Sequence, residues 1–426
     1  MRFKKQTNKT GANAMILGVG SFAHSIGTAL AEAGANVSTY LTRNYGHFSP
    51  TLAGKTYSKE TFPSPVPLIC ENNINVVIPQ SIDWAQAPWA ADIQKSGVGI
   101  FSPVGEAMRI ERERDFARKL CAEFKIPFPR AYVAPTRLEA VKILEKNPRA
   151  YVIKNPLCSP GSPIHTILSE SVAETRAWLQ VVNDAEGIFL QEYLGPAEAG
   201  HIALVSSGEI YSLVTNQEYK RAFNGNMGIV AGAPLGGLVE RDEKDKYGLA
   251  RQLLHPLKPW LRESKFNGPL QVTAIRHKGK WHVIEYNIRI GVTSGPMILR
   301  MLKNPVEIVM RTARNEKLEP VFREKLNFGC SLTLAGYGYP FMQTRSPWLP
   351  LEVKGRFNTD VWWNEVARGP EGNLMATGHR IADVIALAPK LNLAIAKAYE
   401  NIGKIRVAGS YYRTDIGQSL WPPGQK

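Results

Sequence analysis

The sequence predicts an α/β protein that opens with a doubly wound parallel sheet and closes with a small antiparallel-sheet domain. The apolar run at 14–19 leads through the glycine pair Gly18 and Gly20 into helical spacing at 22–34, and a second strand-like run follows at 35–41. This order of strand, glycine turn, helix and strand is typical of parallel nucleotide-binding folds. Further buried runs before residue 105 continue the alternation, which favours a sheet covered by helices on both faces.

Beyond residue 105 the pattern changes to mixed helices and strands. A compact α+β insert at 128–195 precedes a long sheet-rich stretch, and the tail is typical of antiparallel strands with one helix. We expect a disordered basic extension at 1–12, an N-terminal domain at 13–105, a central domain at 106–327 and a C-terminal domain at 328–426. We expect helices at 22–34, 83–96, 109–124, 137–145, 170–182, 244–262 and 389–400, and strands at 14–19, 35–41, 74–79, 97–103, 150–154, 188–193 and 281–286.

The composition fits a folded protein without membrane spans. The chain is 44% hydrophobic and 21% charged, and it has no apolar run of the roughly 18 residues that a membrane helix needs. Its 4 cysteines are widely spaced, which favours reduced thiols in a cytoplasmic protein. The formal net charge of +15 is spread along the chain, without a nucleic-acid-binding signature. It favours small phosphorylated ligands over a polymer, with a generally basic surface as the alternative.

A carboxylate and an amide mark the candidate metal site. Glu285 and Asn287 lie two residues apart at the end of a buried strand, so they project from the same face. Arg289 follows on that face. Hard oxygen ligands suit Mg²⁺ bridging nucleotide phosphates, and a guanidinium suits a transferring phosphoryl group. Taken alone, the same pattern also fits a polar strand face without a ligand.

Several weaker signals point to phosphate and nucleotide binding. Lys154 ends a strand and could neutralise ATP phosphates, and Glu192 belongs to a strand that could meet adenine through its backbone. Glu198 could accept from ribose hydroxyls. Lys220 and Arg221 precede a glycine-rich loop that permits close approach to an anion. The alternative is a surface strand followed by a solvated loop.

The order of these signals resembles the ATP-grasp superfamily, and within it the glycinamide ribonucleotide synthetases (phosphoribosylamine–glycine ligases) over nearly the full length. The stretches Gln217-Glu-Tyr-Lys-Arg221 and Val283-Ile-Glu-Tyr-Asn-Ile-Arg-Ile-Gly291 are similar to family motifs. So are Ala376-Thr-Gly-His-Arg-Ile381 and the closing Tyr411-Tyr-Arg-Thr-Asp-Ile-Gly417. The resemblance implies a central ATP-grasp α+β fold in which 128–195 forms a small lid subdomain.

The resemblance also implies a reaction, in which ATP converts a carboxylate to an acyl phosphate that an amine attacks. It implies ATP with Mg²⁺ or Mn²⁺ as cofactors, an amino acid such as glycine and a phosphorylated amine as substrates, and a monomer or homodimer. Carried over by position, the roles are metal ligands at Glu285 and Asn287; catalytic contacts at Arg289, Lys220 and Arg221; nucleotide contacts at Arg114, Lys154, Glu192 and Glu198; and substrate contacts at Gly18, Gly20, His24, Glu218, Arg413 and Asp415.

Five stretches depart from the family pattern, and one of them is Gln217-Glu-Tyr219, which replaces the family's Gln-Asp-His. Gly20-Ser-Phe-Ala-His24 lacks the arginine and glutamate of the family's N-terminal loop, and Pro79-Gln-Ser-Ile-Asp83 replaces its Gly-Pro-Glu. Pro160-Gly-Ser-Pro163 lacks the phosphate-loop lysine, and Gly291-Val-Thr-Ser294 lacks two acids. We therefore expect a working ligase with an altered acceptor, and keep two alternatives: a non-catalytic binding or regulatory protein of the same fold, and a nucleic-acid-binding protein suggested only by charge.

Overall fold

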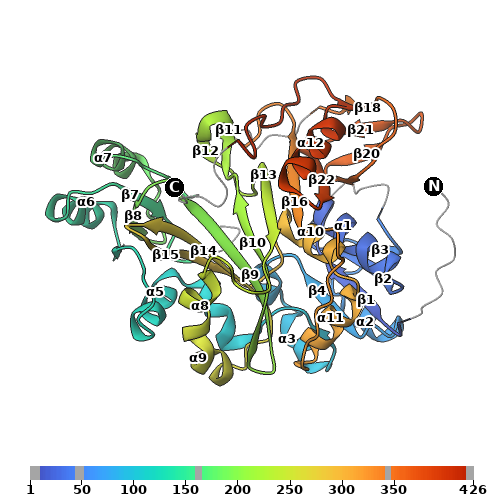
Figure 1. Ribbon diagram of the computed structural model, residues 1–426, viewed down its shortest axis with the longest axis horizontal. Coiled ribbons are helices and arrows are strands. Elements are labelled where there is room, and N and C mark those ends of the chain that lie inside the picture. The colour runs from blue at the N-terminus through green and yellow to red at the C-terminus, as the bar shows by residue number, and fades with distance from the viewer. Residues whose placement is uncertain (1–9, 44–51, 159–165, 341–346, 419–426) are drawn as a thin grey trace.

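The computed structural model describes residues 10–43, 52–158, 166–340 and 347–418 (Figure 1). Two features expected from the sequence fall outside these ranges. They are residues 1–9 of the basic extension and the stretch Pro160-Gly-Ser-Pro163, which the resemblance places over the phosphates.

The N-terminal domain is a parallel five-stranded sheet in the order β3-β2-β1-β4-β5. Its elements are β1 (Asn13–Leu17), α1 (Gly20–Glu32), β2 (Asn36–Leu41), β3 (Lys55–Ser58), α2 (Val66–Glu71), β4 (Val76–Pro79), α3 (Ala90–Lys95) and β5 (Gly99–Ile100). This confirms the predicted parallel sheet. Gly20 opens α1 with a φ of +60°, a conformation that favours glycine.

A long antiparallel sheet runs through the centre of the molecule into the C-terminal region (Figure 1). Its order is β15 (Lys280–Asn287), β14 (Gly268–His277), β9 (Glu198–Ser206), β10 (Glu209–Glu218), β13 (Gly236–Arg241), β16 (Phe328–Ala335), β22 (Arg380–Ala388) and β19 (Asp360–Trp363). Both faces are buried in the middle: Ile202 and Leu204 of β9 join one hydrophobic cluster, and Ala203 and Val205 join another. The domain boundary expected at 327/328 thus separates β13 from β16, although these two strands pair within one sheet.

The expected insert folds as a small lid, which Figure 1 shows at the far end from the N-terminal sheet. It pairs β6 (Ala131–Ala134), β8 (Ile188–Glu192) and β7 (Tyr151–Lys154), with α6 (Arg137–Lys146) and α7 (Val172–Val181). Both helices begin at a hydroxyl cap: Thr136 accepts from the Glu139 N–H and Ser171 from the Glu174 N–H. Lys154 therefore stands at the end of β7, an edge strand of the lid sheet.

The remaining elements connect and cover these sheets. They are α4 (Arg109–Arg112), α5 (Arg114–Glu123), β11 (Arg221–Phe223), β12 (Met227–Val230), α8 (Leu249–Leu253), α9 (Lys258–Glu263), α10 (Ser294–Met301), α11 (Pro305–Ala313), β17 (Leu349–Pro350), β18 (Glu352–Val353), β20 (Val366–Arg368), β21 (Leu374–Ala376), α12 (Leu391–Ile402) and β23 (Ile405–Arg406). The helix expected at 109–124 is two helices, because Glu113 is extended (φ −117°, ψ 103°) and bridges to Leu157. The helix expected at 244–262 is likewise divided into shorter helices, among them α8 and α9.

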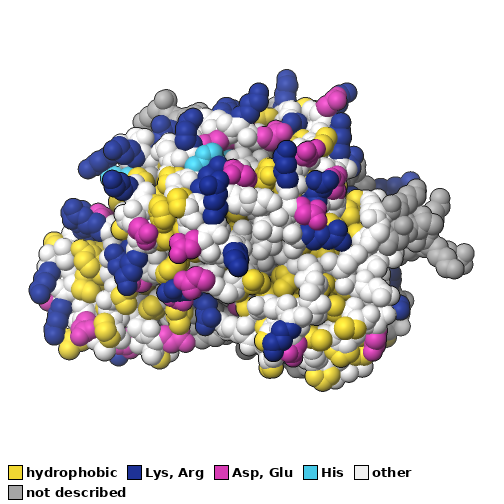
Figure 2. Space-filling view, turned by 90° about the horizontal axis from the view of Figure 1, so that it is seen from below, with side chains coloured by type: hydrophobic (Ala, Val, Ile, Leu, Met, Phe, Trp, Pro, Cys, Tyr) yellow, Lys and Arg dark blue, Asp and Glu magenta, His cyan; other side chains and the backbone are white. Residues whose placement is uncertain are grey.

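The surface carries mixed charge. On the face seen in Figure 2, lysines and arginines are scattered and interspersed with acidic side chains, without a continuous basic stripe. Within the part of the chain described above, no helix is long and apolar enough to cross a bilayer.

Candidate functional site

The two candidate metal ligands owe their direction to a bulge in β15. In the pairing with β14, Val283 is opposite Ala274 but Glu285 is opposite Thr273, so Ile284 is an extra residue. An extra residue shifts the alternation of side chains across the sheet. Val283 faces a hydrophobic cluster, whereas Glu285 and Asn287 turn to the other face together. Their shared face, predicted from the sequence, follows from the regular alternation between them, and the bulge before them sets which face of the sheet it is.

Four charged side chains gather around Glu285. Nζ of Lys220 lies 3.1 Å from one Glu285 oxygen and 2.8 Å from a Glu198 oxygen, and Nη1 of Arg114 lies 3.7 Å from the other Glu285 oxygen. Burial acts to raise the pKa of Glu285, but Lys220, Lys154 and Arg114 hold it well below its ordinary value. Glu285 is therefore ionised throughout the physiological range. Burial likewise opposes the charge on Lys220, but the surrounding carboxylates raise its pKa.

Lys154 is buried and tied to the same strand through one amide. Its Nζ donates to Oε1 of Gln191 at 2.8 Å, and Nε2 of Gln191 donates to the carbonyl of Ile284, the bulged residue, at 3.1 Å. Burial lowers the pKa of Lys154 to about 7, against the attraction of Glu285. The neutral amine form of Lys154 is thus poised to take up a proton when an anion arrives.

Arg289 is held by a buried glutamate that sequence reasoning missed. Oε1 of Glu111 accepts from Nε of Arg289 at 3.2 Å, and its other oxygen accepts from the Ile288 N–H at 2.6 Å. The Arg289 Nη2 also donates to Oδ1 of Asn287 at 3.3 Å. Glu111 thereby fixes both the backbone and the guanidinium that follow β15.

Of two further predicted residues, Glu218 lies at the edge of this cluster and Glu192 pairs with an arginine outside it. Glu218 ends β10, accepts from the Thr293 hydroxyl at 3.4 Å and has a pKa raised by burial. Glu192 ends β8, and its carboxylate pairs with Arg149 at 2.8 Å. Its role toward adenine stays a prediction.

Arg221, Arg413 and Asp415 form a separate group below the hairpin β11–β12. Arg413 is buried; it pairs with Asp415 at 2.6 Å and donates to the Arg221 carbonyl at 3.0 Å. Asp415 in turn accepts from the Gly225 N–H at 2.9 Å. The Arg221 guanidinium meets Glu170, which precedes α7 of the lid. This group therefore anchors the glycine loop to the C-terminal segment, and its substrate contacts stay predictions.

The glycine turn before α1 packs against the C-terminal region. Oδ1 of Asn364 accepts from the Ser21 N–H at 3.0 Å, and it occupies the space that a Cβ on Gly20 would need. Gly18 likewise leaves room for Gln80, whose Oε1 accepts from the Val19 N–H at 2.8 Å. His24 is buried, accepts from the Trp363 N–H at 3.0 Å and has a pKa lowered to about 4 by burial. The substrate roles of these three residues stay predictions.

The structure therefore brings seven predicted residues into one cluster and adds two. The seven come from α5, β7, β9, the link between β10 and β11, β15 and the turn after it: Arg114, Lys154, Glu198, Lys220, Glu285, Asn287 and Arg289. Glu111 and Gln191 were not predicted, because a lone acid in a charged helix and a glutamine in a strand carry no local signal. Only the long-range pairing reveals them.

The donor set fits a divalent ion of the Mg²⁺ or Mn²⁺ type. Glu285, Asn287 and the nearby Glu198 offer carboxylate and amide oxygens, which are the ligands that these hard ions prefer. These oxygens are paired with Lys220, Arg114 and Arg289, so an ion would compete with these cations for them.

Comparison with known families agrees with this geometry. Residues 112–293 match the model of the phosphoribosylglycinamide synthetase ATP-grasp (A) domain, and residues 330–419 match that of the phosphoribosylglycinamide synthetase C domain. The two matches together span more than half of the chain.

Curated relatives and solved structures agree as well. Phosphoribosylamine–glycine ligase of Thermotoga maritima is 27% identical over 94% of this chain and 98% of its own length, and that of Streptomyces coelicolor is 27% identical over 76% and 79%. The crystal structure of the Thermotoga maritima enzyme superposes with a TM-score of 0.76 at 23% identity, covering 95% of this chain and all of that one. A biotin carboxylase from Campylobacter jejuni reaches 0.66 at 12% identity, covering 95% and 94%. These superpositions confirm the expected fold.

Proposed function

The chain belongs to the phosphoribosylglycinamide synthetase family, and on this premise we propose that it is an ATP-dependent ligase that joins glycine to an amine of the 5-phosphoribosylamine type. The single observation that carries the proposal is the cluster around Glu285. It combines a carboxylate kept ionised, an amide on the same strand face and several cations from different elements. A protein that had lost this activity would have no need to keep so many charges together in a partly buried site, since taking charges out of water is costly even when they are paired.

The reaction has two bond exchanges. A carboxylate oxygen of the amino acid attacks the γ-phosphorus of ATP, and the bond from that phosphorus to ADP breaks, which leaves an acyl phosphate. The amine nitrogen then attacks the acyl carbon, the bond to the phosphate oxygen breaks, and the nitrogen loses a proton. The products are an amide, ADP and inorganic phosphate.

The side chains of the cluster divide this work. Lys154 and Arg114 neutralise the nucleotide phosphates, and Gln191 aims the Lys154 ammonium. Arg289, oriented by Glu111, meets the amino-acid carboxylate and the phosphoryl group that it receives. Lys220 holds Glu198 and Glu285 at a fixed separation. Glu285 and Asn287 would hold the divalent ion, which when bound neutralises phosphate charge.

We propose that the acceptor amine binds at the glycine turn and the C-terminal segment. Asn364 and Gln80 already bond the N–H groups of that turn, so the acceptor meets a different surface from the one that the missing family arginine would make. We propose a related phosphorylated amine and a monomer or homodimer. The free state of Cys70, Cys121, Cys158 and Cys330 supports a reducing, cytoplasmic compartment.

The test is ADP release from ATP and Mg²⁺ with glycine, with and without freshly generated phosphoribosylamine. The proposal predicts acceptor-dependent release that Glu285→Ala abolishes. Release that ignores the acceptor, or that survives Glu285→Ala, would overturn the proposal. A matched control is Glu240→Ala, which removes a carboxylate paired with Lys246, outside the cluster.

A further inference from the structure

The acceptor nitrogen loses a proton as it attacks the acyl phosphate, and a side chain near the reacting groups has to receive that proton. A carboxylate can do this when one of its oxygens is free to face the attacking nitrogen. The acids within or beside the cluster around Glu285 are Glu111, Glu198, Glu218 and Glu285 itself. Their contacts distinguish one of them from the other three.

Three of these acids are paired with cations. Glu285 and Glu198 share the ammonium of Lys220, at 3.1 and 2.8 Å. Glu111 accepts from Arg289 through one oxygen at 3.2 Å and from a backbone N–H through the other at 2.6 Å. A neighbouring cation favours the ionised form of a carboxylate, which makes it a weaker base. These three acids therefore serve as the framework of the cluster.

Glu218, at the end of β10, is held more loosely. Within the described ranges its side chain forms no ion pair, and its one hydrogen bond is the 3.4 Å contact in which Oε1 accepts from the Thr293 hydroxyl. Oε2 is left without a hydrogen bond to any described residue. Glu218 therefore keeps an oxygen available to a substrate.

The surroundings of Glu218 suit a base. Burial raises its pKa, and the carboxylates of Glu198 and Glu285 act in the same direction. Lys220 and Arg289 oppose the rise. A general base works best when its pKa lies near the working pH, so a raised pKa favours proton transfer to this carboxylate.

The space next to Oε1 of Glu218 is bordered by Gly291, two residues after Arg289. A Cβ added at Gly291 would lie 3.8 Å from that oxygen and within 4 Å of no other described residue apart from its chain neighbours. The stretch Gly291-Val-Thr-Ser294 supplies no acid of its own. A nitrogen that approaches a group held by Arg289 from this side therefore meets Glu218.

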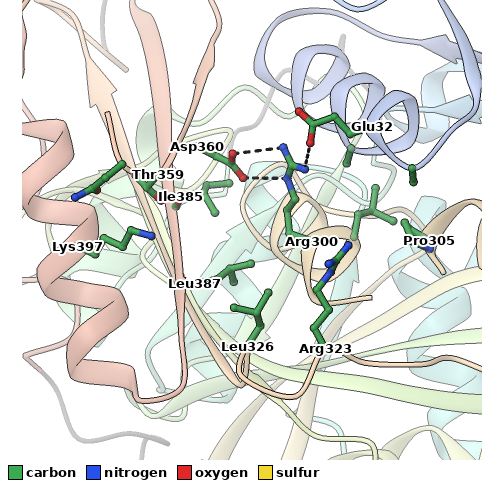
Figure 3. A pocket seen from close by; sticks show the side chains of 14 residues that line it. Glu32, Arg300, Pro305, Arg323, Leu326, Thr359, Asp360, Ile385, Leu387 and Lys397 are labelled. Carbon is green, nitrogen blue, oxygen red and sulfur yellow. Dashed lines mark hydrogen bonds and ion pairs between the residues drawn. The ribbon is translucent and has the colours of Figure 1, made fainter. Parts of the chain in front are cut away.

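Helices α10 and α1 run side by side in the same direction. A Cβ added at Gly295, near the start of α10, would lie 3.7 Å from the side chain of Ile26 in α1. Toward the other end of α10, Arg300 meets Glu32, the last residue of α1, and Figure 3 shows its guanidinium between Glu32 and Asp360. The start of α10 therefore points toward the glycine turn that opens α1.

This arrangement places Glu218 on the side of the cluster that leads to the acceptor. Thr293, which donates to Glu218, immediately precedes α10. The glycine turn, where the acceptor amine is proposed to bind, lies at the corresponding end of α1. Glu218 thus stands between the phosphoryl-transfer residues and the acceptor.

We propose, on the basis of the ligase function above, that Glu218 is the general base of amide formation. The nitrogen forms its bond to the acyl carbon, an N–H bond breaks with its electrons staying on nitrogen, and the proton passes to a Glu218 oxygen. The bond from the acyl carbon to the phosphate oxygen then breaks, and Glu218 returns the proton to solvent. Phosphoryl transfer from ATP needs no such base, because the amino-acid carboxylate is already ionised.

The test is a rapid-quench measurement of ADP formed from ATP, Mg²⁺, glycine and phosphoribosylamine. In Glu218→Gln the first step stays intact and the second is slow, so ADP appears as a burst of about one molecule per site, followed by turnover lowered about 100-fold or more. Glu209→Gln is the matched control, because it changes a half-exposed acid at the start of the same strand, and it should alter neither phase.

A pH profile and a conservative variant separate a base from a residue that only shapes the site. Wild-type turnover should fall as pH drops through the pKa of Glu218, because only the ionised carboxylate accepts a proton, and this fall should be absent from the residual rate of Glu218→Gln. Glu218→Asp keeps the carboxylate and should recover about tenfold or more of the lost rate. Melting temperatures equal to that of the wild type verify that the variants fold.

Three outcomes would overturn the proposal. Loss of the burst together with turnover in Glu218→Gln would mean that Glu218 holds the amino acid instead. Turnover of Glu218→Gln within about threefold of wild type would remove any role for a base there. A Glu218→Asp variant no faster than Glu218→Gln would show that the carboxylate is not what matters. A wild type that forms no ADP with these substrates would instead refute the ligase function itself, and the base with it.

Discussion

The ammonium of Lys220 lies 3.1 Å from Glu285 and 2.8 Å from Glu198, so one lysine joins carboxylates from β15 and β9. In this arrangement Lys220 is the counter-ion of Glu285, the proposed metal ligand. Its positive charge helps to hold the pKa of Glu285 below its ordinary value in a half-buried site.

This pairing predicts competition between Lys220 and the metal. In Lys220→Met the carboxylates lose their counter-ion, so Mn²⁺ should bind more tightly in the absence of nucleotide, while turnover falls. Titration of Mn²⁺ followed by electron paramagnetic resonance measures the affinity. Lys246→Met, which removes a lysine paired with Glu240 elsewhere, is the control and should change neither quantity. Unchanged or weaker Mn²⁺ binding in Lys220→Met would show that these carboxylates do not take the ion.

Asn287 and Arg289 should both be needed for turnover. We expect Asn287→Ala and Arg289→Ala each to lower kcat by about tenfold or more, because each removes a polar contact at the reacting groups. Glu111→Gln should lower kcat less than either alanine variant. Combined with Arg289→Ala it should cause little further loss, since Glu111 acts through Arg289. Steady-state ADP release measures all three. Normal turnover in either of the first two variants would refute the site assignment.

ATP affinity should fall as pH rises above 7. Burial lowers the pKa of Lys154 to about 7, and a bound phosphate favours its charged form, so binding takes up a proton above that pH. Titration calorimetry between about pH 7.5 and 9 should show the loss in wild type, by at most tenfold per unit. Lys154→Arg, which stays charged, should give a flat profile. A flat wild-type profile would contradict the account.

The same shift has a consequence for stability. The pKa of Lys154 is lower in the folded protein than its ordinary value of 10.5, so the unfolded chain binds more protons between about pH 7 and 10.5. Lys154 therefore costs stability at neutral pH, and that cost shrinks as pH rises through this window. Lys154→Met should be more stable than wild type near pH 7, by urea unfolding, and the gain should fade toward pH 10. A less stable variant at pH 7 would contradict this sign.

Arg413 should matter for folding as well as for substrate. Its guanidinium is buried among Asp415, the Arg221 carbonyl and Asn226, so its removal leaves several groups without partners. We expect Arg413→Ala to lower the free energy of unfolding by about 3 kcal/mol. Urea unfolding measures this, and Arg406→Ala, which removes an exposed side chain at the end of β23, is the control. An unchanged midpoint would mean that Arg413 serves substrate alone.

The sequence predicted the fold closely because periodicity and family order are local or linear signals. The parallel N-terminal sheet, the lid and the strand β15 were all expected near their observed bounds. The bulge at Ile284 could not be predicted, because it depends on how β15 pairs with β14. The same holds for Glu111 and Gln191, whose bonds to the segment that contains Ile284 and Ile288 span 177 and 93 residues of sequence. The break at Glu113 was hidden by a run of good helix formers whose local preference yields to the contact with Leu157.

The most direct measurement follows oxygen from glycine to phosphate. Wild-type protein is given ATP, Mg²⁺, phosphoribosylamine and glycine labelled with ¹⁸O in both carboxylate oxygens, and the released phosphate is analysed by mass spectrometry. An acyl phosphate requires one labelled oxygen to leave with each phosphate, and the account predicts that result. Phosphate released without label would mean that water, not the carboxylate, receives the phosphoryl group, and it would contradict the proposed ligase.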